Sequence, residues 1–262
     1  MYHFFNYKNI QIRYTTTGKG RAVVLLHGFL ENLNMWNAIV PELAKKNRVV
    51  TIDLLGYGKS ENLGYIHTME DQAQMVKAVL KHLRLRKYIL IGHSMGGYIS
   101  LAYAEIYSDS IKGFCLLNST ALADTTAKKI NRNRAIKVVK ENHEIFIKIA
   151  IPNLFLEDNR PKFKTEIAQI TNEALQLSKQ SIIASLEGMK IRKDRSEILK
   201  KGDLKKMLIL GKKDPVLEYK LLIKQTKNTN VKVVELPDGH MSHIENKDAL
   251  IILLKDFVKS CN

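Results

Sequence analysis

A serine flanked by glycines lies between an apolar stretch and a sequence typical of a helix. Residues 89–97 read ILIGHSMGG, which places a glycine two residues before and two residues after Ser94. A serine on such a tight turn between a strand and a helix is held out at the edge of a sheet, and small neighbours leave room for the strained turn. Because the pattern has the strand and helix context that this chemistry needs, we expect Ser94 to be a nucleophile.

Two loops further along the chain offer the base and the acid that a serine nucleophile needs. Asp214 follows the apolar segment 207–210, and His240 follows the segment 231–236. Both come directly after predicted strands, in the order Ser, Asp, His that is typical of a nucleophile elbow. We therefore expect His240 to take the proton of Ser94 and Asp214 to orient His240.

The sequence offers alternative interpretations of Asp214 and alternative candidates for the base and the acid. Asp214 alone is equally well explained as a turn aspartate before a proline. His243 is close enough to compete with His240, but Gly239 permits the sharp turn that would aim His240. An acid at the position of Asn118 would be an alternative to Asp214, but the amide of Asn118 carries no charge.

An acyl-transfer reaction also needs two hydrogen-bond donors for its oxyanion. We expect them to be the N–H of Met95, which follows the nucleophile, and the N–H of Phe29, in the loop after the apolar segment 22–26. His27 and Asp53 are interpreted as structural residues that bind loop backbone. Four further histidines have no companions at metal-ligand spacing, and no phosphate loop or dinucleotide fingerprint is present, so we expect no metal and no cofactor.

Length and composition favour a globular chain. Its 262 residues, 45% hydrophobic and 26% charged, suit one large α/β domain or a core with an inserted subdomain. Cys115 lies in an apolar run and is expected in the core, whereas Cys261 is expected to be mobile at the C-terminus. Two cysteines form no disulfide framework, and neither a signal peptide nor an apolar stretch of about 20 residues is evident. These features predict a cytoplasmic protein without a membrane span.

The formal net charge of +16 comes mostly from lysines spread along the chain without interleaved aromatic residues. This distribution indicates a solvated surface and argues against a nucleic-acid partner. One denser cluster, residues 128–140 (KKINRNRAIKVVK), is expected on a helix whose Ile130, Val138 and Val139 face inward. With Arg132 and Arg134 outside, such a helix would suit an anionic acyl carrier, although a solvated face is the stronger interpretation.

The elements that must position these residues alternate between strand and helix, except in one block. Two short strands joined at Lys8-Asn9 come first, and the last helix spans 247–259. From 121 to 194 only helical periodicity is found. This pattern predicts a mostly parallel central sheet flanked by helices, formed by residues 1–120 and 195–262, with an inserted helical cap at 121–194. The predicted strands lie at 22–26, 48–53, 88–91, 111–118, 207–211 and 231–236, and the helices at 35–43, 69–83, 98–107, 127–142, 144–151, 161–177, 179–189 and 218–226.

With these motifs in place, the chain resembles cap-bearing proteins of the α/β-hydrolase-fold superfamily, which includes small carboxylesterases, lactonases, C–C bond hydrolases and thioesterases. The resemblance spans nearly the whole chain outside the cap. It departs from the usual pattern at Leu55-Gly56, where Pro-Gly is common, and in its basic cap. It implies that Ser94 attacks an acyl carbon, His240 moves the proton and Asp214 holds His240. The matching segments are His27-Gly28-Phe29, Asp53 to Ser60, Gly92 to Gly96, Gly211 to Asp214 and Gly239-His240.

We therefore expect a serine hydrolase, monomeric or homodimeric, that cleaves a small carboxylic ester or thioester through an acyl-enzyme. A C–C bond hydrolase or a lyase with the same three residues is an alternative, as is a ligand receptor or scaffold on this fold that performs no catalysis. A serine at position 94 argues against the epoxide hydrolases and dehalogenases of this fold, which use aspartate there.

Overall fold

An eight-stranded sheet forms the centre of the computed structural model, which describes residues 1–261. Its strand order is β1-β2-β4-β3-β5-β6-β7-β8. β2 pairs antiparallel with both β1 and β4, and all other neighbouring strands are parallel. The predicted mostly parallel sheet is thus confirmed. The strands are β1 Tyr2–Tyr7, β2 Ile10–Thr17, β3 Arg21–Leu26, β4 Asn47–Ile52, β5 Tyr88–His93, β6 Ile111–Leu117, β7 Lys205–Gly211 and β8 Lys232–Leu236.

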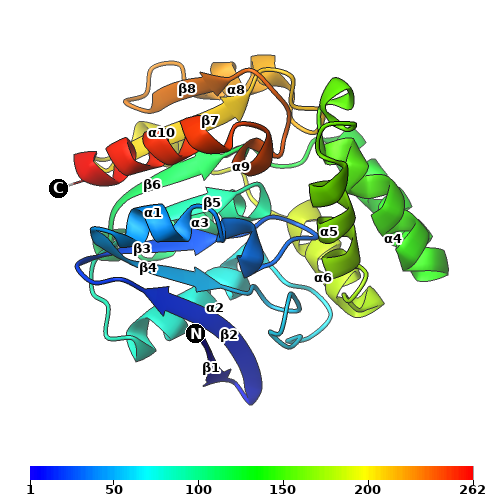
Figure 1. Ribbon diagram of the computed structural model, residues 1–262, viewed down its shortest axis with the longest axis horizontal. Coiled ribbons are helices and arrows are strands. Elements are labelled where there is room, and N and C mark those ends of the chain that lie inside the picture. Colours follow the sequence, from blue (N-terminus) through cyan, green and yellow to red (C-terminus); the bar gives the residue numbers. More distant parts are fainter. Residues whose placement is uncertain (262) are drawn as a thin grey trace.

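Helices cover both faces of the sheet because successive strand residues point to opposite sides. Val24 and Leu90 pack on α2 and α3, whereas Val23 and Ile89 pack on α1 and α10, and all four side chains are fully buried. Figure 1 shows α1 and α10 in front of the sheet. The helices are α1 Val40–Ala44, α2 Met69–His82, α3 Met95–Ile106, α4 Thr126–Ala150, α5 Lys164–Ala174, α6 Lys179–Lys190, α7 Ser196–Lys200, α8 Tyr219–Gln225, α9 Ser242–Glu245 and α10 Lys247–Ser260, with short 3-10 turns η1 Leu33–Trp36, η2 Ser108–Ser110, η3 Pro152–Leu154 and η4 Glu157–Asn159.

Local chemistry sets several element boundaries. Lys8 and Asn9, with φ angles of 50° and 66°, form the predicted turn between β1 and β2. The helix predicted at 35–43 is instead divided into η1 and α1. Pro41 is the second residue of α1, where its missing N–H is tolerated because the first helical turn leaves this group unpaired.

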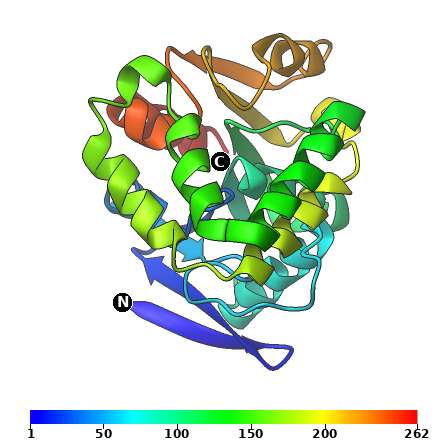
Figure 2. The same ribbon diagram turned by 90° about the vertical axis from the view of Figure 1, so that its right-hand side faces the viewer.

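The chain between β6 and β7 holds α4 to α7 and, within residues 1–261, no strand. Helices α4, α5 and α6 lie at the carboxyl ends of the parallel strands, and Figure 2 shows them in front of the sheet. Asn142 interrupts α4 with φ −150° and ψ 96°, and its Oδ1 accepts the N–H of Ile145 at 3.0 Å. The two helices predicted on either side of this position are therefore present. None of the helices described is long and apolar enough to cross a membrane.

The buried face of α4 differs from the predicted one. Ile136, Val139 and Ile147 are buried, but the side chains of Ile130 and Val138 are 46% and 40% exposed. The prediction for Ile130 and Val138 was wrong because neither lies on the helical face that packs inward. α4 thus presents both basic and apolar side chains to the solvent.

The two cysteines are both buried. Cys115 is fully buried in β6, as predicted. Cys261 is 2% exposed and packs with Phe257 and Val258 against the sheet, so the predicted mobility of this residue was wrong. Apolar side chains in the last turns of α10 hold Cys261 against the sheet. Burial raises the pKa of the Cys261 thiol to about 11.

The chain between β6 and β7, which holds α4 to α7, is called the helical segment below. A buried ion-pair cluster links the start of this segment to the core. Asp124 is fully buried and pairs with Arg132 of α4 and, at 2.6 Å, with Arg192. The Arg192 guanidinium lies 4.1 Å from the centre of the Tyr98 ring on α3. Burial raises the pKa of Asp124, but its bonds to the two arginines outweigh this effect and leave the pKa below its ordinary value.

We expect Asp124→Asn to lower the free energy of unfolding by about 3 kcal/mol at pH 7, because it leaves two arginines facing a neutral partner. A carboxyl whose pKa is lower in the folded state stabilises the fold above its unfolded pKa of about 3.9, and this contribution disappears as the pH falls through the folded pKa. The difference from the unsubstituted protein should therefore shrink in acid. Urea titrations at pH 7 and at acidic pH measure it. Asp203→Asn, at an exposed position, is the control, and an equal loss at both pH values would contradict the prediction.

Candidate active site

Ser94 lies in a strained turn between β5 and α3. Its φ of 49° and ψ of −113° are unfavourable for a residue with a side chain, and its N–H is fixed by the Leu117 carbonyl at 2.9 Å. The turn closes only because the residues two positions before and after Ser94, Gly92 and Gly96, lack side chains. A Cβ on Gly92 would clash with the Gly96 carbonyl, and one on Gly96 with the Leu26 carbonyl. The strand-turn-helix context predicted for Ser94 is thus present.

Asp214 and His240 meet beyond the ends of β7 and β8. His240 Nδ1 lies 2.7 Å from Asp214 Oδ2, and both side chains are almost completely buried. Asp214 Oδ1 accepts the N–H groups of Val216 and Leu217 at 2.8 and 2.9 Å. Burial raises the pKa of Asp214, but His240 and the two N–H groups outweigh it and keep the pKa below its ordinary value. The ionised carboxylate accepts Nδ1–H, which leaves Nε2 of a neutral His240 free to accept a proton.

Asn118 positions Asp214 and the loop of His240 through hydrogen bonds of its side-chain amide. It directly follows β6 and has a φ of 43°, and its Nδ2 donates to Asp214 Oδ2 and to the Gly239 carbonyl, each at 3.1 Å. One amide therefore fixes both the acid and the loop that carries His240. From the sequence, Asn118 was considered only as the place where an alternative acid would stand.

His243, the rival of His240, occupies a different environment. Its Nε2 faces Glu31 Oε1 at 3.4 Å, and its ring lies 5.4 Å from the His93 ring. Burial lowers its pKa to about 4. Of the two histidines, it is His240 that contacts Asp214.

Within residues 1–261, neither of the two N–H groups expected to bind an oxyanion donates to a backbone carbonyl. Met95 is the first residue of α3, so its N–H has no acceptor within the helix. The N–H of Phe29 donates to no backbone carbonyl among residues 1–261. The next residue, Leu30, has a φ of 64°, which turns the chain sharply after Phe29.

His27 and Asp53 bind backbone, as predicted. His27 Nδ1 donates to the Gly28 carbonyl at 2.8 Å, and its Nε2 accepts the N–H of Leu54 at 3.0 Å. Asp53 accepts the N–H of Leu33 and is paired with Arg13. Both residues therefore shape loops at the carboxyl edge of the sheet.

A second buried pair, absent from the sequence prediction, lies behind His240. His93 Nδ1 is 2.7 Å from Glu31 Oε2, and its Nε2 is 3.0 Å from the His240 carbonyl. Both partners are acceptors, so both ring nitrogens donate and His93 is an imidazolium in this arrangement. Burial lowers the pKa of His93, but the Glu31 carboxylate outweighs it and the net shift is upward.

The helical segment is bonded directly to the loop of His240. The His240 N–H donates to the Leu154 carbonyl at 3.1 Å. The buried carboxylate of Glu245 accepts the N–H of Leu156 at 3.0 Å and the N–H of Met241 at 3.2 Å. These contacts place residues 154–156 over the loop.

Comparison with known proteins gives a family for this architecture. Residues 21–137 match the model of a family described as having the alpha/beta hydrolase fold. A thermophilic esterase from Thermogutta terrifontis, in a malate-bound structure, is 26% identical and has a TM-score of 0.92, with 100% of this chain and 99% of the esterase covered.

Curated relatives match over shorter lengths. The dihydrolipoyllysine-residue acetyltransferase component of an acetoin cleaving system from Pseudomonas putida is 29% identical over 86% of this chain and 60% of its own length. The 2-hydroxy-6-oxo-6-(2'-aminophenyl)hexa-2,4-dienoic acid hydrolase of Metapseudomonas resinovorans is 29% identical over 45% of this chain and 42% of its own length. The chain thus spans less than two thirds of each of these relatives.

We expect Asn118→Gly to reduce kcat about tenfold, because it removes the two hydrogen bonds that position Asp214 and the loop of His240. The free energy of unfolding should fall by about 2 kcal/mol, because each lost bond contributes about 1 kcal/mol while glycine tolerates the positive φ. Steady-state kinetics and thermal unfolding of the same preparations measure the two effects. Asn228→Gly, at another position with positive φ (55°), is the matched control. Unchanged kcat in Asn118→Gly would show that Asn118 does not position His240.

Proposed function

The chain belongs to the alpha/beta hydrolase superfamily, and on that premise we propose that it is a serine hydrolase that cleaves a carboxylic ester or thioester. The observation that carries the proposal is the 2.7 Å contact between His240 Nδ1 and Asp214 Oδ2. This contact lies at the carboxyl edge of the sheet, where β5 leads into the turn at Ser94. In this proposal Ser94 is the nucleophile, His240 the base and Asp214 the orienting acid.

Acylation begins when Ser94 Oγ attacks the acyl carbon and its proton moves to His240 Nε2. The oxygen of the tetrahedral intermediate accepts the N–H groups of Phe29 and Met95, which donate to no backbone carbonyl within the described residues. The positive N-terminal end of α3 favours the same negative charge. His240 then protonates the leaving alkoxide or thiolate, and the acyl group remains on Ser94.

Deacylation repeats these steps with water. His240 takes a proton from the water as its oxygen attacks the acyl carbon, and returns that proton to Ser94 Oγ when the acid departs. Asp214 stays ionised throughout, because His240 and two backbone N–H groups hold its charge. No step needs a metal or an organic cofactor.

We further propose that residues 121–194 act as a cap over this site. The Phe146 ring of α4 lies 6.4 Å from the Phe29 ring, beside a proposed oxyanion donor. Phe29 and Phe146 would thus form an apolar wall for the acyl group, and the Leu154 carbonyl would hold the loop of His240 beneath the cap.

The same three residues suit a C–C bond hydrolase, and one curated relative is named as the hydrolase of a 2-hydroxy-6-oxo-dienoic acid, a keto acid and not an ester. We favour ester or thioester cleavage because the esterase from Thermogutta terrifontis has the same architecture over 100% of this chain and 99% of its own, with a TM-score of 0.92.

The test is hydrolysis of p-nitrophenyl esters with acyl chains from acetyl to dodecanoyl. We expect turnover by the unsubstituted protein and a loss of about a thousandfold or more in kcat for Ser94→Ala, with unchanged thermal unfolding. A fluorophosphonate should label the unsubstituted protein once, and Ser94→Ala not at all.

Each other outcome points away from an ester hydrolase. Full activity in Ser94→Ala would reject the nucleophile. Labelling without ester turnover, together with cleavage of a vinylogous 1,5-diketone, would indicate a C–C bond hydrolase. Neither labelling nor turnover would indicate a ligand receptor.

We also propose an anionic acyl carrier as the partner of the outer face of α4. Arg132 is not available for docking, because it is paired with Asp124. Lys129, Arg134, Lys137 and Lys140 are exposed and form no ion pair among the described residues. Together with the exposed Ile130 and Val138, they give this face the charge and the apolar area that an acyl carrier requires.

For the double substitution Arg134→Glu/Lys137→Glu we expect a roughly tenfold lower kcat/KM on an acyl-coenzyme A, and no change on a p-nitrophenyl ester with the same acyl group. The loss should fade as salt is added, because these charges are exposed. Lys227→Glu/Lys232→Glu, outside the helical segment, is the control for net charge. Equal losses on both substrates, or in both variants, would reject the carrier.

A further inference from the structure

Glu31, His93 and His243 form a buried cluster behind the loop of His240. One ligand atom from each residue lies within 4.8 Å of the others. Their side chains are at most 3% exposed, and they come from three separate places, namely the loop after β3, the end of β5 and α9. We propose that these residues bind a divalent transition-metal ion, with zinc as the best match to two imidazoles and one carboxylate.

The cluster contains buried polar atoms that protein groups leave unsatisfied. Glu31 Oε1 and His243 Nδ1 have no hydrogen-bond partner within the described part of the chain. Glu31 Oε1 faces His243 Nε2 at 3.4 Å without forming a hydrogen bond. A buried carboxylate oxygen without a donor is costly, and a cation between Glu31 and His243 would satisfy it.

The distances suit such an ion. Bonds of about 2.0 to 2.2 Å in a tetrahedral zinc site place neighbouring ligand atoms about 3.3 to 3.6 Å apart. Glu31 Oε2 and His93 Nδ1 are 2.7 Å apart, and Glu31 Oε1 and His243 Nε2 are 3.4 Å apart. Binding would move Glu31 and His93 apart by less than 1 Å. The proton on His93 Nδ1 would pass to solvent, and the ion would take its place.

Groups around the cluster already orient two of the ligands. The N–H of Gly28 donates to Glu31 Oε2 at 2.9 Å, and His93 Nε2 donates to the His240 carbonyl at 3.0 Å. A metal-binding histidine usually gives its second N–H to such a carbonyl, which fixes the tautomer and points the other nitrogen at the metal. His93 is therefore held with Nδ1 toward Glu31.

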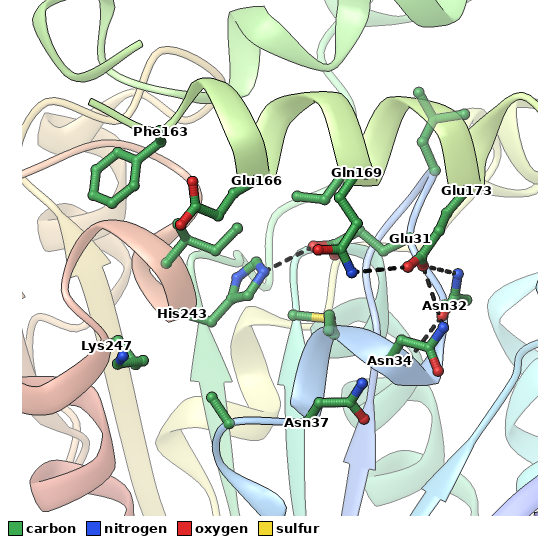
Figure 3. Close-up of a pocket in the computed structure, with 15 residues that line it drawn as sticks. Glu31, Asn32, Asn34, Asn37, Phe163, Glu166, Gln169, Glu173, His243 and Lys247 are labelled. Atoms are coloured by element: carbon green, nitrogen blue, oxygen red, sulfur yellow. Dashed lines mark hydrogen bonds and ion pairs between the residues drawn. The ribbon is translucent and has the colours of Figure 1, made fainter. Parts of the chain in front are cut away.

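An acidic cavity of about 280 Å³ leads to the cluster. Glu31 and His243 line it on one side, and Glu166 and Glu173 line it from α5 (Figure 3). Lys247 also lines it, so the carboxylates outnumber the basic groups in a chain whose net charge is +16. Negative walls of this kind attract cations.

The proposed ion would be structural, because Ser94 and His240 do not line this cavity. It would fix His93, and His93 in turn holds the carbonyl of His240. Binding of the metal does not depend on whether Ser94 is a nucleophile, so this inference stands apart from the proposed function.

The experiment uses the full chain, stripped with EDTA and dialysed against metal-free buffer. Zinc titration by calorimetry should give one equivalent, and cobalt should give the visible absorption of a four-coordinate ion. We expect His243→Ala and Glu31→Gln to bind zinc at least tenfold more weakly. Glu166→Gln, which alters the cavity wall but no ligand, should keep the stoichiometry of one. Ser94→Ala should bind as the unsubstituted protein does.

Folding of each variant is checked by circular dichroism, and zinc should raise the thermal midpoint of the unsubstituted protein but not that of His243→Ala. No stoichiometric binding by the unsubstituted protein would overturn the proposal and leave Glu31 and His93 as a plain ion pair. Binding that survives both His243→Ala and Glu31→Gln would overturn it too, since the ion would then sit elsewhere.

Discussion

The turn at Ser94 is the constraint on which the other parts of the site depend. A residue with a φ of 49° directly after a central strand is stable only if the chain on either side approaches without steric conflict. Gly92, Gly96 and Gly97 provide that space, because a Cβ on any of them would collide with the Gly96 carbonyl, the Leu26 carbonyl or Ser119. Leu30 and Asn118, at the neighbouring strand ends, also have left-handed φ angles. The residues with strained backbone angles thus lie at the carboxyl edge of the sheet, where the proposed chemistry takes place.

Much of this edge can be predicted from sequence because its determinants are local. Continuous apolar runs identify the parallel strands, and the glycines identify the turn at Ser94. Asp214 and His240 are found because each follows a strand directly. The order of strands in the sheet then brings them together, which chain order alone does not reveal.

Other features depend on pairings that no local pattern encodes. His93 contacts Glu31, 62 residues away, and the His240 carbonyl, 147 residues away, so spacing rules for metal ligands or ion pairs do not detect this cluster. The burial of Cys261 follows from the packing of α10 on the sheet, not from its place near the chain end. The exposure of Ile130 and Val138 also could not be predicted from the sequence. A helix can have apolar side chains on several faces, and the elements packed against it decide which face is buried.

Two sets of hydrogen bonds hold the loop of His240, and they come from opposite directions. From the core, Asn118 donates to the Gly239 carbonyl and His93 donates to the His240 carbonyl. From the helical segment, the Leu154 carbonyl accepts the His240 N–H, and Glu245 bridges Leu156 and Met241. A movement of residues 154–156 away from the sheet breaks the second set and leaves the first intact. The bonds from Asn118 and His93 do not involve residues 154–156, so the loop of His240 has anchors in the core that are independent of the helical segment.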